Sequence, residues 1–420
     1  MTVKRILHTS DWHLGQTFHD AERTWEHEQF LSWLRGTLRE REVDALLVTG
    51  DIFDTATPSS VAQRQWFDFL AGVVRDRPQC DVVAIAGNHD SAQRLDAPEA
   101  LTRALGLTVV GSARDANGDF QAERLVVPLG ARSEVGTWGW AATLPFLRGD
   151  DLGTLAELHV DDAYEGLVRR RHEAVFAHLG TVAKPGHARF ALGHGVVLGS
   201  ERSPDSERAV RIGNAEGFSV DVFPADLTYV ALGHLHRPQR VGGKDHVRYA
   251  GSPLPLHVSE AEYAHQVVLI TVDDGALISI EPLLIPKAVA VVRVPAKGRT
   301  APPDEVLAEL RLLTAMGSLP EVQRPWLAVR FLLETPRPGF ADEVVRAIEG
   351  KGYRLTTVEA DRPKGEKVEP LTVHRRLQNL EPIDVFRALY KRHHPDTQPS
   401  LALEQAFREL EQRLAEESGS

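Results

Sequence analysis

Short apolar runs alternate with amphipathic segments through the first third of the chain. Residues 6–7, 45–48 and 82–85 are short apolar runs with the composition of buried strands. Residues 22–40 and 59–75, which lie between these runs, repeat apolar side chains at helical spacing. Strand and helix in alternation predict an α/β fold built on a largely buried sheet.

The rest of the chain predicts the end of this first domain and two further regions. The end of the first domain is marked by Pro282 and Pro286. The expected elements are strand-like segments within 124–142, a helix at about 163–179, strands up to about 285, then strands at 289–294, 326–333 and 353–358 and helices at 304–316, 340–348, 371–393 and 401–417. The predicted domains are therefore 1–285, a small α+β module at 286–365, and C-terminal helices at 366–420.

Polar side chains follow strand-like runs at five places. The five motifs are Asp11-Trp12-His13, Gly50-Asp51-Ile52-Phe53-Asp54, Gly87-Asn88-His89-Asp90, Gly193-His194 and Gly233-His234-Leu235-His236. A sharp turn off a strand often needs glycine. Open α/β sheets bind their ligands at the carboxyl ends of the strands. The recurrence therefore predicts one shared site.

The residue types in these motifs suit a metal ion. Carboxylates, a carboxamide and imidazoles without a thiolate favour Mn²⁺, Fe or Zn²⁺ over a soft metal. A lone histidine at a strand end is more often a hydrogen-bonded or surface residue than a ligand, and Gly-Asn-His-Asp alone could be only a turn. Five such turns in succession are hard to explain in that way. The candidate ligands are Asp11, His13, Asp51, Asn88, His194, His234 and His236.

Length, charge and cysteine content narrow the class of protein. A chain of 420 residues predicts two or three domains. The net charge of −11 excludes a surface coated in positive charge, so nucleic acid would be bound through a local patch, metal ions or a partner. The single cysteine, Cys80, excludes an intramolecular disulfide and fits a reducing compartment. Because no stretch resembles a signal peptide or a membrane span, we expect a soluble, cytoplasmic protein with no membrane partner.

The five motifs, in this order, resemble the calcineurin-like metallophosphoesterase superfamily. Longer stretches at 8–15, 50–55, 86–91, 231–239 and 248–253 resemble its SbcD family of nuclease subunits. The resemblance is dense over residues 5–260, thinner over 288–360 and mainly architectural beyond. It implies a metallophosphoesterase β-sandwich flanked by helices. It also implies a DNA nuclease in repair and recombination, acting as an exonuclease on duplex ends and as an endonuclease on single strands or hairpins.

The resemblance implies a role for each motif residue. Two divalent ions, expected to be Mn²⁺, would share Asp51, with Asp11, His13 and His236 completing one ligand set and Asn88, His194 and His234 the other. Two ions roughly 3.5–4 Å apart can hold a phosphodiester and activate water. His89 would stabilise the transition state or protonate the leaving oxygen; alternatively, it only orients Asn88 or a substrate oxygen. Asp54 would fix a histidine tautomer rather than bind metal.

The resemblance also implies partners: DNA, an SbcC-type ATPase of the ABC/SMC-like class, and a second copy of the chain. The module at 288–360 resembles a cap that restricts which DNA ends reach the metals. The last predicted helix places Leu403, Phe407, Leu410 and Leu414 on one apolar seam. This seam could dock on the ATPase or fold back on its own domain, and the pattern alone favours neither.

For several surface segments the sequence leaves two interpretations open. Arg169-Arg170-Arg171 and Arg375-Arg376 either contact phosphates or form solvated helix faces, which is the commoner case for charge runs. A homodimer could use the helical surface at 22–40 or at 59–75.

Two other functions are open from the sequence. A phosphatase or small cyclic-nucleotide phosphodiesterase would need the same ligands, and the acidic net charge favours it. The long C-terminal extension and the SbcD-like flanks favour the nuclease. A catalytically inactive scaffold is disfavoured, because all seven ligand positions hold competent residues.

Overall fold

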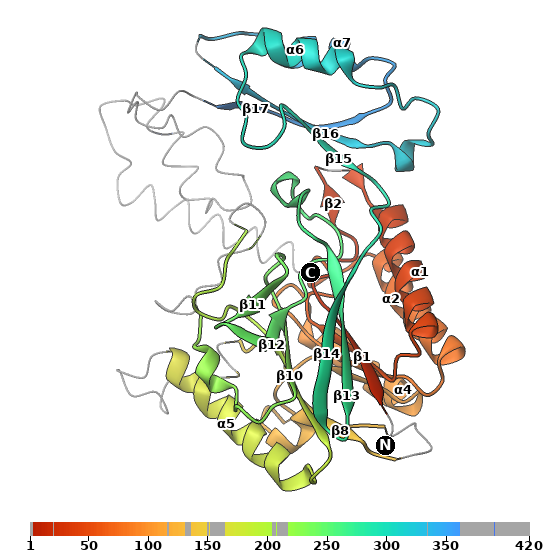
Figure 1. The fold of residues 1–420 in the computed structure, drawn as a ribbon, viewed down its shortest axis with the longest axis vertical. Helices are drawn as coiled ribbons and strands as arrows, with labels where there is room; N and C mark the ends of the chain where they lie inside the picture. The colour runs from red at the N-terminus through yellow and green to blue at the C-terminus, as the bar shows by residue number, and fades with distance from the viewer. Residues whose placement is uncertain are drawn as a thin grey trace. The chain divides into compact units, whose positions relative to one another are not determined.

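Two six-stranded sheets form the body of the fold (Figure 1). The computed structural model describes residues 3–19, 21–115, 117–130, 136–148, 151, 164–203, 207, 217–333, 335–361 and 390. The chain divides into the units Met1–Asp361 and Arg362–Ser420, and every helix and strand named below lies in the first. The predicted C-terminal helices, with the apolar seam and Arg375-Arg376, lie outside the described residues.

The strand order places the first strand of the chain in the middle of one sheet. The first sheet runs β14 (Ala276–Leu284), β13 (Gln266–Asp273), β1 (Lys4–Thr9), β4 (Ala45–Thr49), β5 (Asp81–Ile85) and β6 (Leu107–Val110). The second runs β11 (Gln239–Val241), β12 (Lys244–Tyr249), β10 (Tyr229–Gly233), β9 (Ala188–His194), β8 (Gly139–Leu144) and β7 (Val126–Leu129). Within the first sheet, β1, β4, β5 and β6 are parallel, as the alternating pattern predicted.

The apolar runs are continuous because both faces of the first sheet are buried. In β4, Ala45 and Leu47 belong to the core shared with the second sheet, whereas Leu46 and Val48 belong to the core under the helices. Period-two alternation along one strand thus serves two cores. The fold is the β-sandwich flanked by helices that the sequence predicted.

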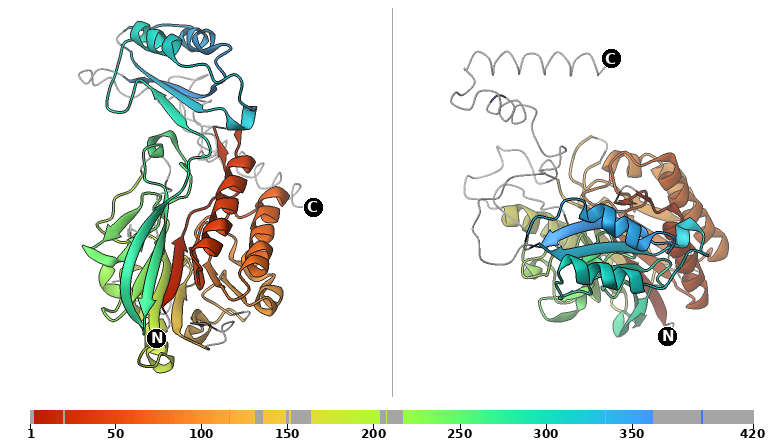
Figure 2. Two further views of the ribbon diagram at one scale, coloured as in Figure 1. Left: turned by 45° about the vertical axis from the view of Figure 1, so that its right-hand side comes forward. Right: turned by 90° about the horizontal axis from the view of Figure 1, so that it is seen from above.

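Helices cover the outer faces of the sandwich. Figure 2 shows α1 (Thr24–Glu40) and α2 (Ser60–Asp76) side by side next to the first sheet, while α5 (Tyr164–Val182) packs against the second. Short helices α3 (Ala92–Asp96) and α4 (Glu99–Ala104) precede β6. The helix predicted from residue 22 begins at Thr24, because β3 (Ala21–Glu22) pairs instead with β2 (Thr17–Phe18).

A three-stranded parallel sheet forms the module predicted after residue 286. Its elements are β15 (Val291–Val294), α6 (Pro303–Leu312), β16 (Trp326–Leu332), α7 (Phe340–Ile348) and β17 (Arg354–Asp361). Both helices pack on one face of this sheet (Figure 1). The helix predicted at 304–316 ends at Leu312, because Leu313 turns into an extended conformation with ψ 134°. No helix within the described part of the chain is long and apolar enough to cross a membrane.

Candidate metal centre

Five parallel strands bring the five sequence motifs to one place. The neighbours β1, β4 and β5 are parallel, and so are β9 and β10 in the facing sheet. All seven candidate ligands lie at or just after the carboxyl ends of these strands. The site therefore sits at the end of the sandwich where α/β sheets gather polar side chains.

The backbone of the site is held in a conformation that most side chains avoid. Asp11, His13, Asp51 and His234 have positive φ angles of 54°, 47°, 48° and 102°. Such residues cost on the order of 1–3 kcal/mol each and persist only where the surroundings determine them. Here the Asp11 amide donates to the carbonyl oxygen of Gly50, and the His13 amide to that of Asp51, both at 3.0 Å. The loops after β1 and β4 thus hold each other in place.

Two glycines allow the strand ends to approach. A Cβ on Gly87 would lie 2.1 Å from Asp51 Oδ1, and a Cβ on Gly233 would lie 1.8 Å from the carbonyl oxygen of Thr49. Since real Cβ atoms do not come so close to other atoms, any side chain at these positions would push the loops apart. Gly87 and Gly233 are therefore required by close packing across the site.

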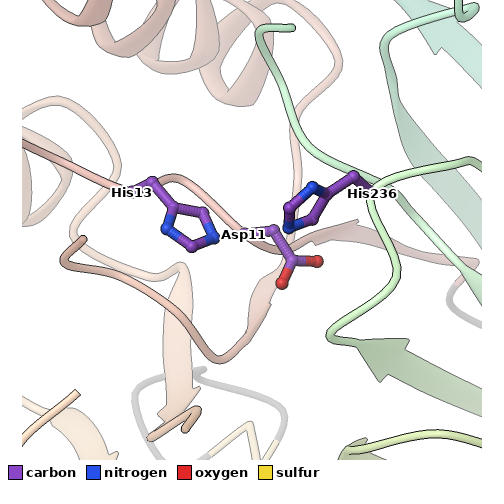
Figure 3. A group of neighbouring side chains, drawn as sticks. All are labelled: Asp11, His13 and His236. Atoms are coloured by element: carbon purple, nitrogen blue, oxygen red, sulfur yellow. The ribbon is translucent and has the colours of Figure 1, made fainter. Parts of the chain in front are cut away.

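The first group of ligand atoms comes from Asp11, His13 and His236, which face one another in Figure 3. The Nδ1 atom of His13 lies 3.1 Å from Asp54 Oδ1. The Nε2 atom of His13 is buried, has no hydrogen-bond partner among the described residues, and lies 3.6 Å from Asp51 Oδ2.

The second group comes from Asp51, His194 and His234, with Asn88 beside them. His194 Nδ1 donates to the carbonyl oxygen of Thr49 at 2.8 Å, which leaves its Nε2 lone pair directed at the site. This Nε2 atom lies 3.4 Å from Asp51 Oδ2 and 3.0 Å from Asn88 Oδ1. His234 Nδ1 lies 2.8 Å from the same Asn88 oxygen. The structure thus brings all seven predicted residues together in two adjoining groups.

The electrostatics of the site favour bound cations. Burial opposes charge on Asp51, but His194 and His13 hold its pKa well below the usual range. Burial likewise opposes charge on His194 and His236, yet Asp51 next to the first and Glu260 next to the second raise both pKa values to about 9. Metal binding replaces protons on imidazoles. Carboxylates that stabilise positive charge at these ring nitrogens therefore favour a metal ion in the same way.

The donor atoms fit divalent metal ions. In each group the ligand atoms lie within 4.8 Å of one another on buried side chains. Oxygen and imidazole donors without sulfur suit hard and borderline ions. The buried, unpartnered Nε2 of His13 is the kind of atom that needs such an ion, because an unsatisfied polar atom in the interior is costly.

His89 lies beside the seven candidate ligands, and its side chain forms a third cluster of possible metal-binding atoms with those of His13 and Asp54. Its amide donates to Asp51 Oδ1 at 2.8 Å, and its Nδ1 lies 2.7 Å from the carbonyl oxygen of Asp54. The ring stands edge-on to that of His13 at 4.8 Å between centroids and is half-buried. His89 is therefore held rigidly, with its Nδ1 engaged by the protein.

Two buried carboxyl groups support the site and were not predicted from the sequence. Glu260 Oε1 lies 2.9 Å from His236 Nδ1. Asp90 accepts hydrogen bonds from the amides of Ile52, Phe53 and Gly87, and so joins the loops after β4 and β5. Burial, reinforced by Asp51, raises the pKa of Asp90 to about 6. Asp90 ends a motif and could have been found there, whereas Glu260 belongs to none of the five motifs.

The basic triplet on α5 is partly committed to the protein itself. Arg171 Nε donates to the carbonyl oxygen of Asp151 at 2.9 Å, and its guanidinium lies 4.5 Å from the centre of the Phe120 ring. Arg169 lies 3.7 Å from Glu165 on the same helix. These contacts favour the structural interpretation for Arg169 and Arg171.

Comparison with known proteins agrees with this geometry. The calcineurin-like phosphoesterase family matches residues 4–238, and the type 5 capsule protein repressor C-terminal domain matches residues 287–394. The SbcD component of the nuclease SbcCD from Rhodobacter capsulatus is 40% identical over 366 residues, covering 86% of this chain and 88% of that protein. The chain belongs to the SbcD family of calcineurin-like phosphoesterases.

Two other members of the SbcD family match over two thirds or more of their own length. The Escherichia coli K12 protein is 32% identical over 418 residues, covering 98% of this chain and 96% of its own length. The Bacillus subtilis protein is 33% identical over 274 residues, covering 64% of this chain and 67% of its own length. Membership confirms the predicted family and makes the chain a metal-dependent phosphoesterase, which is the class of enzyme that its donor atoms suit.

Proposed function

We propose that this chain is the nuclease component of an ATPase–nuclease complex that processes DNA breaks and hairpins. It hydrolyses phosphodiesters at duplex ends as an exonuclease and in single strands or hairpins as an endonuclease. The observation that carries this proposal is the convergence of seven metal-binding side chains from five strand ends. Relatives that share most of this chain's length are named as components of a nuclease, which supports DNA as the substrate.

The proposed cofactors are two divalent ions, most simply Mn²⁺. Asp51 would serve both ions, because its Oδ2 atom lies within 3.6 Å of a ring nitrogen in each group. The sets are Asp11, His13 and His236 for one ion and Asn88, His194 and His234 for the other. When bound, such a pair polarises the phosphoryl oxygens and activates water for in-line attack.

The protein's own groups then orient the substrate and move a proton. With Nδ1 of His89 held by the Asp54 carbonyl oxygen, its Nε2 atom is the one that can contact the reacting phosphate. We assign His89 to donating a hydrogen bond or proton to an oxygen of the scissile phosphate. Asp54 and Glu260 keep His13 and His236 in the tautomers that present Nε2 to the ions.

The proposed domain organisation follows the sequence boundaries. Residues 1–285 form the nuclease domain, 286–365 a cap that restricts access of DNA ends, and 366–420 the helices that bind an SbcC-type ATPase. A homodimer through α2 is supported by its two exposed apolar side chains, Val61 and Phe67. The single, buried cysteine supports a cytoplasmic location.

A cleavage assay tests the proposal. The full chain is incubated with a blunt duplex, a DNA hairpin and a small phosphodiester, in Mn²⁺ or Mg²⁺, with and without the ATPase partner. We expect cleavage of both DNA substrates in Mn²⁺, and none by Asp51→Ala. The matched control is Asp245→Ala, which removes an exposed carboxylate. Hydrolysis of the small phosphodiester alone would instead support the phosphatase alternative.

A further inference from the structure

A buried polar contact joins the three-stranded module to the first helix of the nuclease domain. Trp326 Nε1 donates to Glu26 Oε1 at 3.0 Å, and Arg23 Nη2 donates to Glu26 Oε2 at 2.7 Å. The guanidinium of Arg354 lies 3.4 Å from the centre of the Trp326 ring and 3.7 Å from Glu26 Oε1. The Glu26 carboxylate thus binds both sides of the junction, away from water.

The same junction includes a segment that leads to the metal centre. Trp326 packs with Phe18, Val258, Val289 and Ala328 in one apolar cluster. Of these, Val258 belongs to the segment 253–261, which contains a short 3₁₀ helix at Val258–Glu260. The module therefore packs directly on this segment.

Arg23 ties the segment to Glu26 from its other side. Its Nη1 atom donates to the carbonyl oxygen of Pro255 at 2.6 Å and to Gln16 Oε1 at 3.0 Å. Gln16 in turn donates to the carbonyl oxygen of Leu256 at 3.1 Å. The position of residues 255–256 is thus fixed by a side chain that itself depends on Glu26.

The last two contacts reach a metal ligand. The Leu256 amide donates to Glu260 Oε2 at 2.7 Å, and Glu260 Oε1 lies 2.9 Å from His236 Nδ1. The Glu260 side chain is fully buried. A continuous series of buried hydrogen bonds therefore runs from Trp326 through Glu26, Arg23, the Pro255–Leu256 peptide and Glu260 to His236.

We propose that this series couples the seating of the three-stranded module to the metal centre, with Glu26 and Glu260 as positioning residues. Seating of Trp326 on Glu26 holds Arg23 and the segment 253–261, and the segment holds the His236 imidazole in its metal-binding orientation. Loosening the module lowers the affinity for the ion bound by His236. The proposal rests on the metal centre of the proposed function, but its first test needs no metal.

Hydrogen exchange of the metal-free full chain tests the mechanical link. Trp326→Phe keeps an aromatic ring in the junction and removes the indole N–H; Trp140→Phe is the control, because it removes an indole hydrogen bond to His187 elsewhere. We expect Trp326→Phe to speed exchange in residues 253–261 by about two- to tenfold, the equivalent of one lost hydrogen bond. The control should leave that segment unchanged.

Binding of Mn²⁺ alone, measured by titration calorimetry, tests the consequence. Glu260→Gln should lower the affinity for one of the two ions by about 10- to 100-fold, as loss of a group that orients a ligand does. Trp326→Phe and Glu26→Gln should lower the affinity for the same ion by a smaller factor. The double variant Trp326→Phe/Glu260→Gln should bind as weakly as Glu260→Gln alone, because both changes interrupt one series.

Two results would overturn the coupling. One is unchanged exchange in 253–261 together with unchanged Mn²⁺ affinity in Trp326→Phe and Glu26→Gln. The other is a double variant whose loss equals the product of the single losses, since that marks independent sites. Failure of the proposed function is distinguishable, because it would appear as a wild-type chain that binds no Mn²⁺ or cleaves no DNA, while the exchange comparison still decides the mechanical link.

Discussion

Buried histidines occur in two kinds of surroundings in this molecule. His8 and His13 are close in sequence and are both buried. Both ring nitrogens of His8 are hydrogen-bonded, to Tyr229 Oη and Thr49 Oγ1, each at 3.0 Å. His13 is held at Nδ1 by Asp54, while its Nε2 atom has no hydrogen-bond partner in the described chain. Both ring nitrogens of His8 are used by hydrogen bonds in the core, whereas the Nε2 atom of His13 is left as a donor atom for a metal ion.

The electrostatic surroundings differ in the same sense. Burial lowers the pKa of His8 to about 3 and that of His172, on α5, to about 4. Equally complete burial fails to lower the pKa of His194 and His236, because carboxylates next to them raise it to about 9. Burial alone therefore does not distinguish a ligand from a core residue. Neighbouring carboxylates set His194 and His236 apart, but burial lowers the pKa of His234, another candidate ligand, to about 3.

Asp51→Ala should have the largest effect on metal binding. Removal of the bridging carboxylate affects both ions, so we expect a loss of Mn²⁺ affinity beyond the roughly 10- to 100-fold that loss of an orienting residue produces. Titration with Mn²⁺ measures it, and DNA cleavage should disappear with it. Binding of two ions at wild-type affinity would contradict the shared role of Asp51.

His89→Ala should separate catalysis from metal binding. Because His89 is not one of the seven proposed ligands, Mn²⁺ affinity should stay within about threefold of wild type, while kcat falls by about 10²- to 10⁴-fold, the usual contribution of a positioned acid or base. Single-turnover cleavage of a hairpin measures the loss. The control is His178→Ala on α5. Near-normal turnover by His89→Ala would leave the residue only an orienting role.

The candidate ligands could be named from the sequence because most of them follow a local pattern. A polar residue after an apolar run, with glycine at the turn, marks Asp51, Asn88, His194 and His234. His8, which belongs to none of the five motifs, lies within β1. Several expected elements differ from the structure in their bounds; for example, β2–β3 pairing delays the start of α1, and an extended Leu313 shortens α6.

Glu260 and Glu26, which lie outside the five motifs, were not predictable in this way. Glu260 lies 24 residues from His236 in sequence, and Glu26 lies 300 residues from Trp326. An isolated glutamate on a helix or in a loop is ordinarily a solvated charge, so no local pattern distinguishes these two. Positive φ angles at Asp11 and Asp51 are likewise set by tertiary contacts. Long-range contacts thus decide orientation, whereas local pattern decides which residue types are present.

The substitutions Gly87→Ala and Gly180→Ala compare a glycine in the metal centre with a glycine on α5. An added Cβ at Gly87 meets the carboxylate and amide of Asp51, so we expect a loss of about 1–3 kcal/mol in unfolding free energy and weaker Mn²⁺ binding. At Gly180 on α5 nothing lies within 4 Å of the new Cβ, and alanine should add about 0.5–1 kcal/mol. Urea unfolding and Mn²⁺ titration measure both, and equal effects at the two positions would refute the close-packing explanation.

His172→Phe should change acid sensitivity without touching the metal centre. His172 donates from Nδ1 to the carbonyl oxygen of Val168 at 2.8 Å and packs against Phe176, Phe218 and Phe223. Its pKa is about 4 when folded and near 6.5 when unfolded, so the unfolded chain binds the extra proton as pH falls through this window. Between pH 6.5 and pH 5, the free energy of unfolding of the wild type should therefore fall by about 1.5 kcal/mol more than that of His172→Phe.

Urea unfolding of the metal-free proteins at both pH values gives this difference directly. The histidines of the metal centre titrate in both proteins and cancel, which isolates the core histidine. Equal losses in the two proteins would show that His172 is protonated, or exposed to water, in the folded state. In that case its surroundings would not be the opposite of those of His194, and burial together with a backbone acceptor would be insufficient to keep a core histidine neutral.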